Sequence, residues 1–100
     1  MAPKRLYHPG DPVTSFTAEP GLVLSPEDLA SARERLAEGR RPGSFFAPGC
    51  CHSPDFVTQV PVLFRDRTWD VMRTMSIRRA PDLSEEVREE LRSLLEEIRA

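Results

Sequence analysis

The sequence predicts a small α+β domain, in which an antiparallel hairpin over residues 56–64 and 69–79 packs against helices at 25–38 and 84–99. Three observations support this fold class. The chain has 100 residues, a length that suits one domain, and we expect 1–100 to form it. Apolar residues alternate through the hairpin with the period of a strand. Two other segments carry apolar stripes with the period of a helix.

The N-terminal arm, residues 1–24, contains four prolines and leaves room for short extended segments that would widen the sheet. A helix start follows it. Ser25 is a good N-cap, and Pro26 suits the first helical position because that residue needs no N–H donor. Gly39 suits the residue that follows a helix. These signals predict the helix at 25–38.

A long segment rich in proline and glycine, residues 39–55, comes next and shows no periodicity. Loops of this length within a compact domain are usually functional or disordered. The adjacent pair Phe45 and Phe46 favours partial packing, so we expect an ordered loop and a candidate working surface.

The hairpin register is predicted by pairing Phe64 with Trp69, which places the apolar faces of both strands on the same side. The helices are then expected to pack on the face that includes Met75. Pro61 would fall in a non-hydrogen-bonded pair, which indicates an edge strand or a bulge, because proline cannot donate to a ladder.

One residue, Arg73, interrupts the apolar face of this hairpin. One interpretation is a bulge, or a side chain whose stem packs while its head reaches water. The other is a buried arginine that pairs with a carboxylate or receives an anionic ligand.

The last helix, at 84–99, follows Pro81 and is expected to begin with Asp82 or Ser84 as its cap. Its apolar positions recur with helical spacing and form one continuous stripe. The opposite face is acidic, since residues 84–100 hold six Glu and three Arg. The stripe consists of Val87, Leu91, Leu94, Leu95 and Ile98.

The charge balance argues against a protein held to nucleic acid by bulk charge, because the net charge is −2. Lys4 is the only lysine among 14 basic residues, and the chain contains no Asn. This composition is typical of a GC-rich bacterial genome, and it is compatible with a thermophile.

The chain has no apolar run that resembles a signal peptide or a membrane span, so we expect a cytoplasmic protein that does not contact a membrane. Cys50 and Cys51 are adjacent. Neighbouring Cα atoms lie about 3.8 Å apart, whereas an ordinary disulfide needs about 4.4–6.8 Å. Reduced thiols are therefore expected, which agrees with a cytoplasmic location.

The only cluster of reactive residue types is formed by Cys50, Cys51 and His52. These three are the redox or metal candidates, and a cysteine-dependent or metal-binding protein is our second alternative. Three consecutive side chains do not converge easily on one zinc ion, and recognised catalytic motifs are absent. We therefore predict no enzyme activity, no cofactor and no metal site.

The arginines between residues 39 and 81 form a second candidate surface, since this part of the chain holds seven Arg and three Asp. Arginine and exposed aromatic side chains can hold phosphates and stack on bases. A nucleic-acid-binding protein is therefore the first alternative. The candidate binding residues, for protein or nucleic acid, are Arg40, Arg41, Phe45, Phe46, Arg65, Arg67 and Arg73.

The function we predict first is a small non-catalytic interaction protein, which self-associates or serves as a subunit or regulator of a larger complex. Edge strands and aromatic loops recruit protein partners, and small domains with thin cores often gain stability by association. A protein partner or a homo-oligomer is therefore expected. The segment Gly10-Asp11-Pro12-Val13 resembles the opening strand of small SH3-like barrels, but we carry no property over from it.

Overall fold

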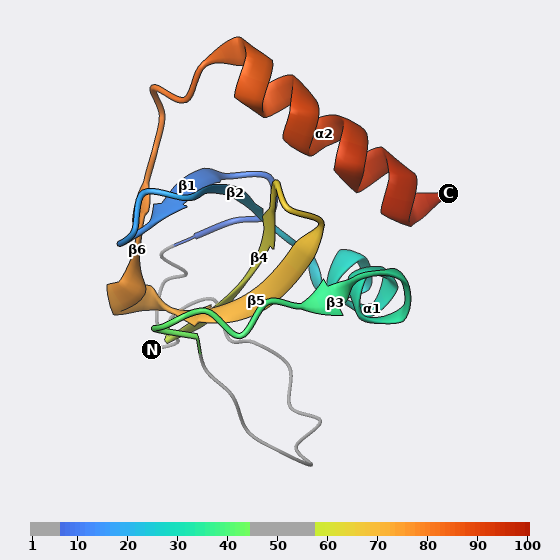
Figure 1. Cartoon of the computed structure of the whole chain (residues 1–100), viewed down its shortest axis with the longest axis horizontal. Helices are drawn as coiled ribbons and strands as arrows, with labels where there is room; N and C mark the ends of the chain where they lie inside the picture. The colour runs from blue at the N-terminus through green and yellow to red at the C-terminus, as the bar shows by residue number, and fades with distance from the viewer. Residues whose placement is uncertain (1–6, 45–57) are drawn as a thin grey trace, which may run out of the picture.

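The computed structural model describes residues 7–44 and 58–100, and it confirms the α+β class. A six-stranded mixed sheet has the order β3-β5-β4-β2-β1-β6, and two helices pack against it (Figure 1). The elements are β1 (Pro12–Ser15), β2 (Pro20–Val23), α1 (Pro26–Arg35), β3 (Ala37–Glu38), β4 (Gln59–Phe64), β5 (Thr68–Arg73), the 3-10 turn η1 (Thr74–Ser76), β6 (Ile77–Arg79) and α2 (Glu85–Arg99).

The five strands other than β3 pair antiparallel in the spatial order β6-β1-β2-β4-β5. Along the chain, η1 connects β5 to β6. Helix α1 and strand β3 lie between β2 and β4 along the chain. Figure 1 shows α2 along the upper side of the molecule, outside the strands, and α1 lying beside β3.

Helix α1 begins where the caps predict and ends earlier than expected. The Ser25 hydroxyl accepts the N–H of Asp28 at 3.1 Å. The helix ends at Arg35, because Leu36 adopts an extended backbone and Ala37 begins β3, which pairs parallel with β5. The predicted helix at 25–38 therefore covers two elements of the structure, the helix α1 and the short strand β3.

The hairpin exists, but its predicted register is wrong by one residue. Phe64 pairs with Thr68, and Leu63 pairs with Trp69, across a turn of Arg65–Arg67. Arg67 takes the left-handed conformation with φ 64°. Such a residue closes a three-residue hairpin loop. Because side chains alternate along a strand, this shift puts Phe64 and Trp69 on opposite faces of the sheet.

The second strand of the hairpin is also shorter than predicted. It ends at Arg73, η1 follows, and β6 leaves to pair with β1. Arg73 lies opposite Gln59 and its side chain is exposed, so the interpretation as a buried arginine is wrong. Met75 lies in η1 and is exposed, so the prediction that helices pack on it is wrong too.

Strand β4 is an interior strand, which corrects the edge-strand interpretation of Pro61. It pairs with β5 on one side and β2 on the other. Pro61 lies opposite Val71, and its carbonyl oxygen accepts the N–H of Leu24 at 2.9 Å. The ladder between β2 and β4 ends at the pair Val23–Val62, because β2 ends at Val23. Pro61 therefore lies one residue beyond this ladder, and its missing N–H removes no hydrogen bond from it.

Both faces of β4 are buried, because the sheet has a core on each side. One core lies within the curve of the sheet and contains Val60, Val62 and Phe64 of β4. The other lies between the sheet and the two helices and contains Leu63. Helix α2 covers this second core with Leu94 and Ile98, as its predicted stripe requires, and Ser84 caps it.

Candidate interaction surface

Arg41, one of the predicted binding residues, lies at the centre of an ion network, and its own side chain is largely buried. Only 9% of its side chain is exposed. Its Nε donates to Glu19 at 2.9 Å, one Nη donates to Asp70 at 2.9 Å, and the other donates to Asp66 at 2.8 Å. The guanidinium carbon lies 3.8 Å from the centre of the Phe64 ring. We call these residues the Arg41 clamp, namely Arg41, Glu19, Asp66 and Asp70.

The sequence analysis did not identify the three carboxylates of the clamp, and Asp70 is the most deeply buried of them. Its side chain is fully buried, and it accepts the backbone N–H of Arg40 at 2.6 Å besides the Arg41 guanidinium. A β-carbon on Gly39 would lie 2.5 Å from Asp70 Oδ2, so glycine lets the chain approach this carboxylate. The corrected hairpin register would have indicated it, since Asp70 then pairs with Val62 and lies on the same inward face as that residue.

Two members of the clamp, Arg41 and Asp66, have shifted pKa values. Burial opposes the charge on the Arg41 guanidinium, but its hydrogen bonds to Glu19, Asp70 and Asp66 outweigh burial and raise its pKa. Burial likewise opposes ionisation of Asp66, but hydrogen bonds from Thr68 and Arg41 lower its pKa. The clamp joins the segment after β3 to the β1–β2 and β4–β5 turns.

Arg65 and Arg67, at the hairpin tip, both pair with α2. Arg65 lies 2.7 Å from Glu90, and Arg67 lies 2.8 Å from Glu97. All four side chains are exposed to solvent, so each pair contributes at most about 1 kcal/mol. Glutamates of α2 thus neutralise the positive charge of Arg65 and Arg67, which the sequence analysis proposed as binding residues.

Arg40 and Arg73 have exposed side chains, as expected of binding residues. They lie on different elements, since Arg40 follows β3 and Arg73 precedes η1. Phe45, Phe46, Cys50, Cys51 and His52 lie outside the described residues, so the predictions for the long loop and for the reactive cluster stay predictions. In residues 7–44 and 58–100, no group of three His, Cys, Asp or Glu side chains could hold a metal ion.

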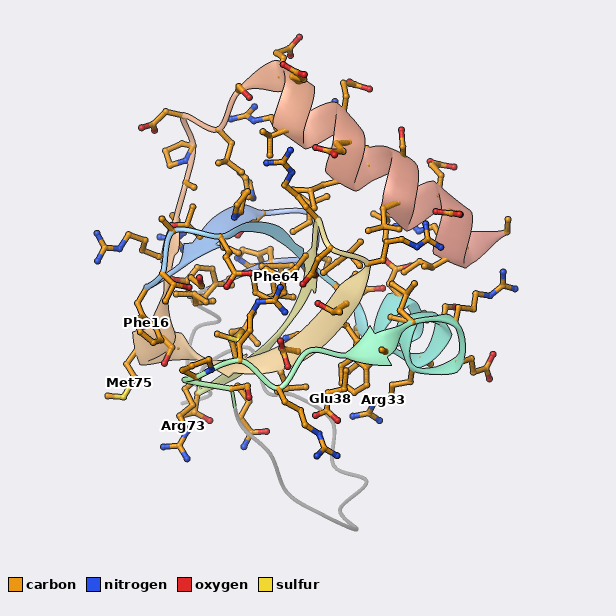
Figure 2. All side chains as sticks on the ribbon, in the orientation of Figure 1. Phe16, Arg33, Glu38, Phe64, Arg73 and Met75 are labelled. Carbon is orange, nitrogen blue, oxygen red and sulfur yellow. The ribbon has the colours of Figure 1, made fainter. Side chains whose placement is uncertain are left out.

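The feature that sequence reasoning did not identify is a pair of exposed large apolar side chains. Phe16, in the β1–β2 turn, is 55% exposed, and Met75, in η1, is 87% exposed. Figure 2 shows both at one corner of the molecule, together with Arg73. We call Phe16, Met75 and Arg73 the corner patch.

Backbone contacts hold the corner patch together. The Phe16 N–H donates to the Ser76 carbonyl oxygen at 3.0 Å, which joins the β1–β2 turn to η1. The Arg73 N–H donates to the Gly43 carbonyl oxygen at 3.1 Å. Gly43 has φ +89°, and a β-carbon there would lie 2.5 Å from Ser76 Oγ. The patch residues therefore come from two segments that are distant in the sequence, and a third segment, at Gly43, contacts them.

In the described parts of the chain, no helix is long and apolar enough to cross a membrane. Comparison with protein-family models, with curated proteins and with solved structures finds no match to this chain.

Proposed function

We propose that this chain is a small non-catalytic interaction protein, and that it binds a protein partner through the corner patch. The exposure of Phe16 and Met75 is the observation that carries the proposal. Exposed apolar side chains that lie together on a small domain are typical of interaction sites, and Phe, Met and Arg are enriched at protein interfaces.

The charge around the corner patch favours an acidic partner. Residues 73–79 contain three arginines and no Asp or Glu. Arg73 and Arg78 are exposed, and Arg79 lies over the Tyr7 ring at 5.3 Å. A second copy that met this patch with its own patch would bring like charges together, which costs free energy. A partner segment in which apolar side chains alternate with acidic ones would match this surface. Its apolar side chains would contact Phe16 and Met75, and its acidic side chains would lie near the arginines of residues 73–79.

The nucleic-acid alternative receives less support from the geometry. Of the arginines proposed for it, Arg41 lies within the clamp, while Arg65 and Arg67 are paired with glutamates of α2. Phe16 and Arg73 remain an aromatic ring and a cation on one surface, which single-stranded nucleic acid could also use. The experiment therefore includes an oligonucleotide.

The test measures binding of a labelled acidic peptide, Glu-Glu-Phe-Glu-Glu-Leu-Glu-Glu, by fluorescence anisotropy. A second peptide replaces each Glu with Lys, and a dT oligonucleotide of 12 nucleotides is the third probe. We expect binding of the acidic peptide alone, and a loss of at least about tenfold in affinity, about 1.4 kcal/mol, in the double variant Phe16→Ser/Met75→Ser.

The matched control is Arg35→Glu, to be compared with Arg73→Glu, since both reverse one exposed arginine. Only Arg73→Glu should weaken peptide binding. Equal binding by the wild type and the double variant would contradict the proposal. Preferential binding of the oligonucleotide would favour the nucleic-acid alternative. Sedimentation equilibrium over a range of concentrations should show a monomer, and a dimer that the double variant abolishes would replace the acidic partner with a second copy.

A further inference from the structure

A small pocket separate from the corner patch lies between α2 and the first two strands. Its volume is about 200 Å³. Gly10, Pro12 and Leu22 line one side, and Arg88, Arg92 and Leu95 of α2 line the other. We call it the Arg88 pocket. None of its residues belongs to the clamp or the corner patch, so it offers an independent site.

The walls of the Arg88 pocket suit a short aliphatic group. Leu22, Pro12 and Leu95 provide apolar surface. Gly10 has φ +92°, and a β-carbon there would meet no atom within 4 Å, so this side of the pocket is open. In liquid water one molecule takes about 30 Å³, so the volume corresponds to about seven waters. A group of fewer than about ten heavy atoms fits this space, and a longer ligand would extend out through the open side at Gly10.

Two guanidinium groups supply the polar part of the pocket. Arg88 and Arg92 are four residues apart on a helix, so their side chains lie on the same face. Arg92 pairs with Glu89 at 2.7 Å in an exposed ion pair, which is weak and exchangeable. Arg88 donates one Nη to the carbonyl oxygen of Pro81.

Arg88 also has a donor for which the described residues supply no acceptor. Its Nε is buried and has no hydrogen-bond partner among the residues that the structure describes. Buried donors without an acceptor are rare in native proteins, because each one loses its bond to water without gaining another. A negatively charged acceptor in the pocket would add charge-assisted hydrogen bonds to the Arg88 guanidinium.

We propose that the Arg88 pocket binds a short aliphatic carboxylate. The alkyl group packs on Leu22, Pro12 and Leu95, and the carboxylate accepts hydrogen bonds from Arg88 and Arg92. The same chemistry is offered by a free branched-chain acid and by the C-terminal carboxylate of a peptide that ends in leucine, and both bind at this one site.

The test is a titration of the ¹⁵N-labelled protein with four probes, followed by amide chemical shifts in two-dimensional NMR spectra. Isovalerate carries the alkyl group and the charge, isovaleramide the alkyl group alone, and acetate the charge alone. N-acetyl-glycyl-leucine represents the peptide C-terminus. We expect saturable shifts at Gly10, Leu22 and Leu95 with isovalerate, and affinity at least about tenfold weaker for isovaleramide and for acetate. Tighter binding of the dipeptide than of isovalerate identifies a peptide as the ligand, and the reverse identifies a free acid.

Two variants test the role of the arginines. Arg88→Met keeps the aliphatic stem and removes the donors, so isovalerate affinity should fall at least about tenfold. Arg92→Met should weaken binding in the same direction, and it carries the test if Arg88→Met does not fold. The matched control is Arg33→Met, which removes an exposed helix arginine over Trp69 and should leave the affinity unchanged. Equal affinity for isovalerate and isovaleramide, or an unchanged affinity in both pocket variants, would overturn the proposal.

Discussion

Replacing Arg41 with methionine removes the cation that lies among three carboxylates of the clamp. Two of these, Glu19 and Asp66, are partly exposed and can turn to water. Asp70 cannot, because its side chain is fully buried. In the variant Asp70 keeps one hydrogen bond, from the Arg40 backbone N–H, and loses its counter-ion. Methionine retains an apolar stem against Phe64, so the change acts mainly on charge and hydrogen bonding.

The expected loss follows from the cost of an unpaired buried charge. Removing one partner of a buried ion pair lowers the free energy of unfolding by about 3–5 kcal/mol. The remaining bond to Arg40 places Arg41→Met near the lower end, at about 3 kcal/mol. For a domain of this size that corresponds to a fall in melting temperature of about 12–24 °C. The total stability of such domains is only about 5–15 kcal/mol, so the variant should be markedly less stable.

The assay is urea unfolding followed by the fluorescence of Trp69, the only tryptophan in the chain. Its indole Nε1 donates to the Leu36 carbonyl oxygen at 3.2 Å, so unfolding changes its surroundings. The control is Arg67→Met, which removes an exposed arginine from its pair with Glu97. That variant should lose less than about 1 kcal/mol.

A double-mutant cycle with Asp70→Asn isolates the interaction between the two buried groups. Asparagine removes the charge that Arg41 neutralises. The loss in the free energy of unfolding of the double variant should therefore be smaller than the sum of the losses of the two single variants. We expect a coupling energy of about 1–3 kcal/mol. The reasoning fails if Arg41→Met loses less than about 1 kcal/mol, or if the two losses add without coupling.

Three further predictions concern the helices and the sheet. The Arg99 guanidinium hydrogen-bonds Asp28 and lowers its pKa below the ordinary value of 3.8, so the folded state binds fewer protons than the unfolded state. This contribution to stability is complete above about pH 4 and is lost as the pH falls through the folded pKa, and acid titrations of Asp28→Asn should lack it. Gly21→Ala would place a β-carbon 2.5 Å from Val62 Cγ1 and should cost about 1–3 kcal/mol in urea unfolding. Leu94→Ala should cost about 2–5 kcal/mol by calorimetry, and a loss below 1 kcal/mol would show that α2 does not cover the second core.

The helices were the part of the fold that local sequence signals predicted well. Ser25 caps α1 and Ser84 caps α2 in the structure, and the apolar stripe of α2 packs into the second core. Caps and stripes depend on residues only a few positions apart, so they can be recognised without the rest of the chain. The end of α1 was missed because β3 forms only by pairing with β5, which is distant in the sequence.

The candidate surfaces were predicted less well, because charge and exposure depend on distant partners. Arg41 looked like a free cation in the sequence, but Asp70 and Glu19 reach it from other strands and turns. Phe16 lies in the N-terminal arm, where the sequence predicts only short extended segments, and Met75 was predicted on the face that the helices cover. The bend at η1 leaves both exposed at one corner.

By itself, the sequence determined the α+β class, the two helices with their N-caps, and the presence of a hairpin, since each rests on local periodicity and local hydrogen bonding. Tertiary structure decided the register, the place of β4 inside the sheet, and which arginines are paired. A strand buried on both faces, as β4 is, has no polar side to indicate its register, so alternation left two registers open. The left-handed turn at Arg67 and the pairing with β2 selected one of them, and that choice brought Asp70 to Arg41.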